Sequence, residues 1–504
     1  MAMEYPASAD SSADSRLTGN TLCDTLRGIE GRELVFRMRF NTGTDPSAGA
    51  ATAANGNSPG RDALWRRNVF AATIHYIFLS ASMALADPTT IIPALITHLT
   101  GSPALVGLTS SVLVGGGVAP QLLFARWIEP RPRKKTFMLA AVYVRAAALA
   151  AMGVPLLWLA GWRSGATIAT AYLLFLAAVL IFSVAGGMGG VAYADVIGKV
   201  IPAGLRGRFY GTRQLFGIGA AFAAGLGAKG ILAGIGAGAA GGAGGTQFYQ
   251  AYASLFLIAG VSLFLGATGF ILVKEPVGTG PAMGAAGGAA TTQAPASARS
   301  SQSPAYFRRV VDILRRDRRL RALIVLGNVI GVHMMLAPFY TVYAQKVIGV
   351  PAARVGLFLL AVLLGNGLTT VWWGRIADRM GGLRALRLSV GLAAAVPLVA
   401  LALGRGLPWA YAFTFLLVGM VNAGYQVATA TYLLEIAPEG MRPTYAGIQG
   451  TLTFMTFVFP AVGGLFIERF SFAPAFIASS IAIALALAAT RRPVEGAAKP
   501  EYRP

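Results

Sequence analysis

Long runs of apolar residues alternate along the chain with short polar and basic stretches. The runs are about 20 to 30 residues long, the length that a helix rising 1.5 Å per residue needs to cross roughly 30 Å of hydrocarbon. This pattern predicts an all-α membrane protein with about twelve transmembrane helices. The fifth is the weakest because its run is rich in glycine and alanine. The predicted helices are 68–97, 104–127, 136–161, 166–190, 212–237, 249–273, 320–344, 353–375, 385–405, 409–433, 446–468 and 471–490.

Composition and charge agree with lipid as the solvent. Hydrophobic residues make up 55% of the chain and charged residues 12%, roughly half the charge of an ordinary soluble domain. A net charge of +22 would suit a nucleic-acid partner, but most of the 42 lysines and arginines flank the predicted helices on the side of the N-terminus. This asymmetry predicts an inner-membrane protein with both termini in the cytoplasm. The exceptions are Arg163, Lys346, Arg354, Arg405 and Arg469 in outer loops and Arg145 and Lys229 within helices.

The polar stretches divide the chain into segments. A low-complexity stretch rich in glycine, alanine and serine follows the sixth apolar run and separates two sets of predicted helices. It leads into residues 307–321, where apolar positions at helical spacing and many cations predict a basic surface helix. The predicted organisation is a largely disordered cytoplasmic tail at 1–67, a six-helix bundle at 68–274, a cytoplasmic linker at 275–319, a second six-helix bundle at 320–490 and a cytoplasmic tail at 491–504.

An internal repeat relates the two halves. Val106-Gly107-Leu108 in the second predicted helix recurs as Val355-Gly356-Leu357 in the eighth. The loop segment 202–211 likewise resembles 438–447. Because the two matches fall at equivalent places, we expect two pseudo-symmetric bundles that arose by duplication. Paired bundles are typical of secondary transporters, which bind their substrate between the halves near the membrane midplane.

The loop after the eighth helix carries a recognisable motif. The segment from Gly374 through Asp378, Arg379 and Gly381 to Arg384 resembles the signature of the major facilitator superfamily, Gly-x-x-x-Asp-Arg-x-Gly-Arg-Arg, although its closing basic positions are altered. The resemblance implies that Asp378 and Arg379 form ion pairs with neighbouring helix ends and help to hold one face of a transporter shut. A tight glycine turn whose charges only fix topology remains the alternative.

The first half carries a degraded copy of this motif. Residues 125–134 replace its glycine by alanine and its aspartate by Glu129, and they contain two prolines. By the same resemblance, Glu129, Arg131 and Arg133 are the equivalent gating candidates.

Ionisable residues at membrane depth are candidates for function because they cost free energy to bury. Arg145 is predicted near the midplane, where it would pair with a carboxylate, bind an anionic substrate or bond backbone carbonyls. Asp87 is predicted nearer the outer face, too far in depth for a direct pair with Arg145. It would cap a helix broken at Pro88 or bind a proton or cation.

Other polar residues fall within the predicted helices. His75 and His333 would relay protons or serve as neutral, hydrogen-bonded core residues. The amides would contact substrate or form interhelical hydrogen bonds, and one pair shares a helix face. These amides are Asn366, Asn422 and Gln426.

No metal-ligand spacing, nucleophile motif or phosphate-binding loop occurs in the sequence, so we expect neither an enzyme nor a metal or cofactor. The sequence predicts a monomeric secondary transporter of a small solute that works by alternating access, with a coupling proton or cation left open. A membrane-embedded sensor or receptor that retains a transporter fold is the alternative. The expected partners of the transporter are the solute and the lipid bilayer, not nucleic acid.

Overall fold

The structure is a computed structural model in which the elements of the described residues are all helical. Ten of these helices are long and apolar enough to cross a membrane. The prediction of an all-α membrane protein is therefore confirmed. The structure describes residues 59–118, 120, 124, 127–128, 131, 133–161, 165–201, 206–239, 244–276, 304–438, 441, 445, 448–450, 452–453 and 457–490.

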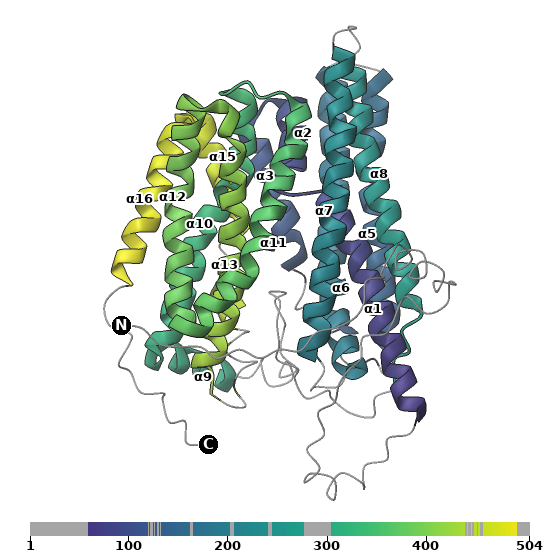
Figure 1. The fold of residues 1–504 in the computed structure, drawn as a ribbon, viewed down its shortest axis with the longest axis vertical. Helices are drawn as coiled ribbons and strands as arrows, with labels where there is room; N and C mark the ends of the chain where they lie inside the picture. Colours follow the sequence, from purple (N-terminus) through teal and green to yellow (C-terminus); the bar gives the residue numbers. More distant parts are fainter. Residues whose placement is uncertain are drawn as a thin grey trace, which may run out of the picture. The chain divides into compact units, whose positions relative to one another are not determined.

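The helices of the first half precede the linker (Figure 1). Helix α5 packs against both α6 and α8, and α3 also contacts α6. These contacts bury a core of small and aromatic side chains, including Phe175 of α6 and Phe256 of α8. The bounds are α1 Pro59–Leu85, α2 Ile91–Thr100, α3 Pro103–Val118, α5 Lys135–Gly161, α6 Gly165–Val200, α7 Arg206–Ala239 and α8 Gly244–Ile271.

The second half begins with the short helix α9 and follows the same plan. Helix α13 packs closely on α11, and α12 contacts both α13 and α16. The bounds are α9 Pro304–Arg316, α10 Arg318–Lys346, α11 Val355–Met380, α12 Gly382–Gly406, α13 Ala412–Ile436, α15 Phe459–Phe470 and α16 Phe472–Ala489, with 3-10 turns η4 at Ala352–Arg354 and η5 at Pro408–Ala410.

The contact of α11 with α13 shows why these helices need glycine. A Cβ atom built on Gly365 would lie 2.1 Å from the carbonyl oxygen of Leu416, and one on Gly419 would lie 2.2 Å from that of Val362. No side chain fits at such distances. The two backbones are therefore in direct contact, as is usual where small residues line the interface of membrane helices.

The first predicted crossing is not one continuous helix. It is divided into α1 and α2 by a turn at Ala86–Thr90. Asp87 and Pro88 cause the break, because the carboxylate accepts hydrogen bonds from the backbone of the next turn and proline has no N–H for the helix ladder. The predicted crossing at 68–97 is therefore formed by two helices, with the break at the position where Pro88 had been expected to allow one.

The second and eleventh predicted crossings are described in part, as α3 Pro103–Val118 and α15 Phe459–Phe470. The uncertain fifth crossing is the long helix α7, which meets the criteria for spanning a membrane. Its glycines therefore do not shorten it.

The predicted surface helix is divided from the crossing that follows it. Helix α9 ends at Arg316, and Asp317 caps α10 by accepting hydrogen bonds from the backbone of Arg319 and Leu320. The other carboxylate oxygen of Asp317 accepts a 2.7 Å hydrogen bond from the hydroxyl of Tyr445. Residues 1–58 of the predicted N-terminal tail, the predicted tail at 491–504 and most of the predicted linker lie outside the described residues, whereas 59–67 belong to α1.

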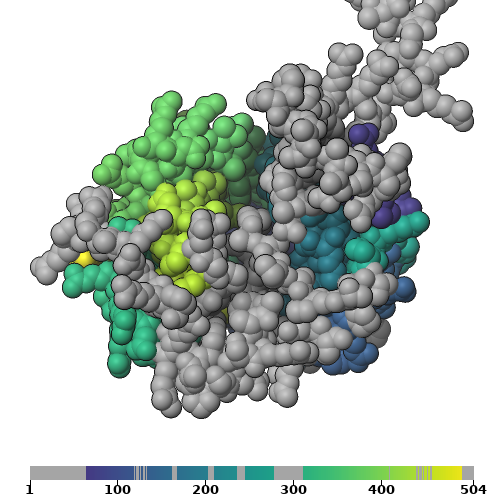
Figure 2. Space-filling model, turned by 90° about the horizontal axis from the view of Figure 1, so that it is seen from below, coloured from purple at the N-terminus to yellow at the C-terminus, as the bar shows by residue number. Residues whose placement is uncertain are grey.

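The bundles have a linker end and a distal end. The linker end is where α9 lies and α10 begins, and the distal end is where α10 ends at Lys346 and α3 begins at Pro103. Figure 2 looks onto the linker end, where the coloured atoms belong to helices of both halves. Residues 60–504 form one compact unit.

Candidate functional site

Glu468 of α15 connects the second half to the first at the distal end. Its carboxylate accepts a 2.8 Å hydrogen bond from the hydroxyl of Ser102 and a 2.9 Å bond from the backbone N–H of Ala104. Helix α3 has no acidic residue in its own first turn. Glu468 therefore supplies the negative charge that favours a helix N-terminus, and it does so from the other half of the protein.

Further hydrogen bonds join the halves at the same end. The hydroxyl of Thr341 on α10 donates to the carbonyl of Thr89 at 2.7 Å, and the ammonium of Lys346 donates to the carbonyl of Gly101. Both acceptors flank α2, the short helix created by the break after α1. The break therefore provides free carbonyl groups where the second half can bind them. We call these contacts and those of Glu468 the distal latch.

Glycine contacts bring the two backbones together beside the distal latch. A Cβ on Gly107 of α3 would lie 2.2 Å from the carbonyl oxygen of Pro460, and one on Gly464 of α15 would lie 2.5 Å from that of Pro103. Neither position can carry a side chain in this state. The distal end is therefore closed by direct backbone packing as well as by hydrogen bonds.

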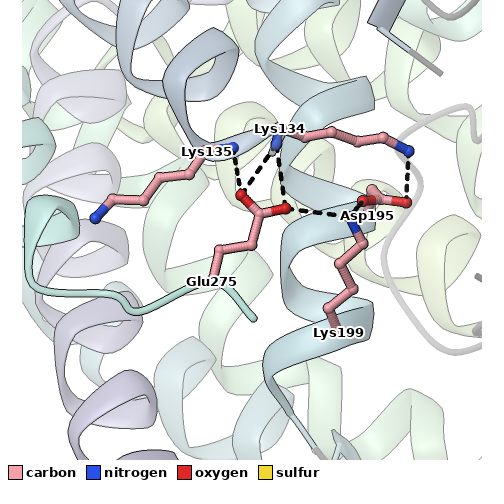
Figure 3. Close-up of polar contacts among 5 residues, drawn as sticks. All are labelled: Lys134, Lys135, Asp195, Lys199 and Glu275. Carbon is pink, nitrogen blue, oxygen red and sulfur yellow. Dashed lines mark hydrogen bonds and ion pairs between the residues drawn. The ribbon is translucent and has the colours of Figure 1, made fainter. Parts of the chain in front are cut away.

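At the linker end, the first half holds a cluster of five charged residues (Figure 3). The ammonium of Lys134 lies 2.8 Å from one oxygen of Asp195, and that of Lys199 lies 2.7 Å from the other. Lys199 also lies 3.1 Å from Glu275. The carboxylate of Glu275 accepts hydrogen bonds from the backbone N–H groups of Lys134 and Lys135.

This cluster joins three elements. Glu275 follows α8, Asp195 and Lys199 lie near the end of α6, and the two lysines begin α5. The Glu275 side chain is only 3% exposed, whereas that of Asp195 is 16% exposed. Because Glu275 caps α5 from a buried position and also pairs with a cation, it is the residue on which the cluster depends most.

The second half has a related contact. One carboxylate oxygen of Glu435, at the end of α13, accepts a 2.7 Å hydrogen bond from the backbone of Gly382 at the start of α12. The turn requires glycine twice: Gly381 has a φ of +84°, and a Cβ on Gly382 would lie 2.4 Å from the backbone nitrogen of Tyr432. Gly382, at a position where the motif has a basic residue, thus brings α12 close to α13.

The charged residues of the predicted motif lie around that turn. Asp378 and Arg379 are exposed in the last turn of α11, and Arg384 is exposed in the first turn of α12. A Cβ on Gly374 would meet open space.

The equivalents in the first half are only partly described. Arg131 and Arg133 are exposed before α5, and the guanidinium of Arg131 lies 5.9 Å from the ring centre of Phe137. Glu129 lies outside the described residues.

Arg145 lies near the middle of α5, where its guanidinium faces α1 and α6. Its carbon Cζ lies 4.4 Å from the ring centre of Phe182, and Nη2 lies 3.7 Å from the sulfur of Met83. The Nε atom is buried without a hydrogen-bond partner among the described residues. The guanidinium of Arg145 therefore contacts the aromatic ring of Phe182 and the thioether of Met83.

Arg213 of α7 is a buried cation, with only 6% of its surface exposed. Its Cζ lies 4.4 Å from the ring centres of both Tyr76 and Tyr210 and 5.4 Å from that of Tyr193, whose hydroxyl accepts a hydrogen bond from Nη1. Tyr76 in turn donates a 2.5 Å hydrogen bond to Gln214. As for Arg145, Nε is buried without a partner among the described residues.

Asp87 is engaged by its own turn. Its Oδ1 atom accepts hydrogen bonds from the backbone and the hydroxyl of both Thr89 and Thr90, at 2.7 to 2.9 Å. These contacts close the turn before α2, whose N-cap residue is Thr90, and the roles predicted for Asp87 stay predictions. The contacts hold α2 in place beside the distal latch, and they do not bring Asp87 to Arg145.

The remaining polar candidates do not gather at one site. His75 and His333 are buried, and the ring centre of His333 lies 6.3 Å from that of Tyr340. Asn366 and Asn422 are half-buried, whereas Gln426 is exposed.

The last observations concern Lys229 and the residues that could bind a metal ion. Lys229 is exposed on α7, and its backbone packs on Gly356 at the distal end. In the part of the chain that the structure describes, no three His, Cys, Asp or Glu residues are arranged to hold a metal ion.

The family model described as Major Facilitator Superfamily matches residues 76–456 and 335–504, which together cover most of the chain. The chain belongs to the major facilitator superfamily. This assignment confirms the resemblance seen in the loop after α11. No curated protein matches the chain in sequence.

Solved structures of superfamily transporters share the fold at low identity. A bacterial homologue of the iron transporter ferroportin, in an inward-facing state, has a TM-score of 0.59 at 13% identity over 85% of this chain and 100% of its own. A bacterial homologue of the human lysosomal transporter Spinster has a TM-score of 0.56 at 14% identity, covering 86% and 97%. A D-xylose–proton symporter has 0.55 at 15%, covering 85% and 98%.

Several residues of this superfamily member were missed by sequence reasoning. Glu275 was placed at the start of a linker, and Arg213 was counted with the cytoplasmic cations that flank a helix. Only the spacing of Asp195 and Lys199, four residues apart on one helix, was a local signal for an ion pair. Glu468 bonds to residues more than 360 positions away, which no local pattern predicts.

Proposed function

We propose that this protein is a secondary active transporter that moves a small solute by alternating access. The observation that supports this most is the distal latch, which joins the two halves through reversible polar contacts and through small residues. Contacts of this kind can separate without unfolding either half. The solute would bind between the halves, near the midplane.

In this proposal the described structure is the state closed at the distal end. The linker end then faces the cytoplasm, in keeping with the basic residues that flank the helices there. Asp378 and Arg379 are exposed at that end, ready to pair with opposing helix ends when the cytoplasmic side closes. The cluster around Glu275 keeps α5, α6 and α8 together, so that the first half moves as one body.

Coupling to a proton or cation completes the proposal. The solved relatives named above include a symporter coupled to protons and a homologue of a metal transporter, so the shared fold carries different solutes. The rival hypothesis is a sensor that binds a solute and does not move it.

Flux through the purified protein tests the proposal against the sensor. A thermal-shift screen against metabolites and drugs would first identify a solute that stabilises the protein. Uptake of that solute into proteoliposomes would then be measured for a Cys23→Ser, Ser102→Cys, Glu468→Cys variant, oxidised and reduced. We expect saturable flux that stops when a disulfide locks the distal latch and returns on reduction. A stabilising solute that never crosses the membrane would favour the sensor and contradict the proposal.

A further inference from the structure

Two arginines of the first half, half-buried Arg145 and buried Arg213, lie along one seam. Arg145 contacts Met83 on α1 and lies beside Gly186 on α6, where a built Cβ would be 3.4 Å from Nε. Arg213 contacts Tyr76 on α1 and Tyr193 on α6. On each helix the two contact positions are seven residues apart, which is two turns on the same face and a rise of about 10 Å. The two guanidinium groups therefore lie at two levels between α1 and α6. That of Arg213 lies toward the linker end, and that of Arg145 lies near the midplane.

The charges along this seam are unbalanced. Neither arginine forms an ion pair with a carboxylate among the described residues. Within the described helices, the acidic residues lie near helix ends, and Asp87 is occupied by Thr89 and Thr90. A guanidinium cannot release its proton in a protein, so neither residue can lower the cost of burial by becoming neutral.

The aromatic contacts leave part of each guanidinium available. Phe182 lies over Arg145, and Tyr76 and Tyr210 lie over Arg213. Aromatic rings attract the flat face of a guanidinium, whereas its N–H donors point outward in the plane of the guanidinium. In both residues Nε is buried and makes no hydrogen bond within the described part of the chain. The free donors are of the type that binds carboxylate, phosphate or sulfonate oxygens in pairs.

We propose that the seam between α1 and α6 binds an organic anion, with Arg213 as the binding residue nearer the cytoplasm and Arg145 as the central binding residue. The anionic group takes the in-plane N–H donors, and an apolar or aromatic body packs beside the neighbouring rings. The inference rests on the proposed transport function and names its substrate class. It also assigns a role to Arg213, which lies close to the linker end, where a cytoplasmic solute would arrive.

Matched probes of one size test the charge preference of the seam. Benzoate, phenyl phosphate and benzenesulfonate would be compared with neutral benzamide and cationic benzylammonium by thermal shift on the purified full chain. We expect at least one anion to raise the melting temperature in a saturable way, and the neutral and cationic probes to have little effect. If none of the three anions stabilises the protein more than benzamide does, the inference is overturned.

Variants assign the effect to the two arginines. Arg145→Gln should abolish the shift caused by the anion, and Arg213→Gln should weaken it. Arg145→Lys, which keeps the charge and loses paired donors, should reduce apparent affinity by roughly tenfold. Arg405→Gln, an exposed cation at the distal end of α12, is the matched control and should behave as wild type. An unchanged anion shift in both Gln variants would assign the two arginines a purely structural role and contradict the inference.

A measurement on the unmutated protein covers the case in which a variant fails to fold. Phenylglyoxal modification of Arg145 and Arg213, followed by mass spectrometry, should be slowed by the stabilising anion and not by benzamide. Equal modification with and without the anion would overturn the inference. These binding measurements are separate from flux. Anion binding without transport would contradict the proposed function alone. Flux of an uncharged solute without anion binding would contradict this inference alone.

Discussion

Glu468 on α15 accepts a 2.9 Å hydrogen bond from the backbone N–H of Ala104, 364 residues earlier in the chain. The bond places a carboxylate of one half at the N-terminus of a helix in the other. A helix N-terminus left without this partner must find water or another acceptor. The free energy gained by capping α3 therefore stabilises the closed state of the distal end.

The glycine at the closest backbone contact of the distal end should be essential for closure. Gly107→Ala places a Cβ 2.2 Å from the carbonyl oxygen of Pro460, so α3 must move away from α15. We expect a lower melting temperature and a loss of transport. Gly219→Ala on α7, where nothing lies within 4 Å of the added atom, is the control and should be close to neutral. Equal behaviour of the two variants would contradict direct backbone packing in this state.

Removal of the negative charge at Glu275 should loosen the linker end of the first half. Glu275→Gln weakens two backbone hydrogen bonds at the start of α5 and the pair with Lys199. We expect a loss of about 1 to 3 kcal/mol, seen as a melting temperature lower by a few degrees. The more exposed Asp195→Asn should cost less. A larger effect at Asp195 would show that the ion pairs, and not the helix cap, stabilise the cluster.

Asp378 should matter for transport and little for the stability of this state. Its side chain is exposed at the end of α11, so Asp378→Asn should leave the melting temperature within about a degree of wild type. Flux should fall several-fold if the carboxylate pairs only when the cytoplasmic side is closed. Asp312→Asn, at an exposed aspartate of α9, is the control. Normal flux in the Asp378 variant would reduce the motif to a topological signal.

The predicted orientation in the membrane can be tested with one cysteine. In a Cys23→Ser background, a cysteine at the exposed position Asp312 should resist an impermeant thiol reagent on intact cells and react after lysis. A cysteine at exposed Trp409, between α12 and α13, should react without lysis. The opposite pattern would invert the topology, and with it the assignment of the linker end to the cytoplasm.

The sequence predicted those parts of the fold that depend on local composition. Apolar runs of sufficient length located the helices because lipid requires a continuous apolar surface and a satisfied backbone. Asp378 in the last turn of α11 and Gly381 after it marked the turn because their spacing is part of a motif. The break after α1 also had a local sign in Asp87 and Pro88, but an apolar run on both sides concealed it.

The contacts that join distant segments could not be predicted in this way. Glu275 and Glu468 each cap a helix far from them in sequence, and a carboxylate beside a helix end looks the same in sequence whether or not it caps another helix. Arg213 was concealed differently, because a cation near a helix end usually reaches water. Only the placement of Tyr76 and Tyr193 around it shows that it is buried.

Distances measured by pulsed electron paramagnetic resonance across both ends test alternating access most directly. Spin labels would be placed at Gln250 and Trp409 for the distal end and at Thr136 and Leu388 for the linker end, all exposed. Each pair would be measured in proteoliposomes, with Glu468→Ala to weaken the distal latch and Arg469→Ala as its control. We predict that Glu468→Ala lengthens the distal distance and shortens the distance at the linker end, while Arg469→Ala changes neither. If the two distances stay fixed, or lengthen together, the halves do not alternate, and the proposed mechanism is wrong.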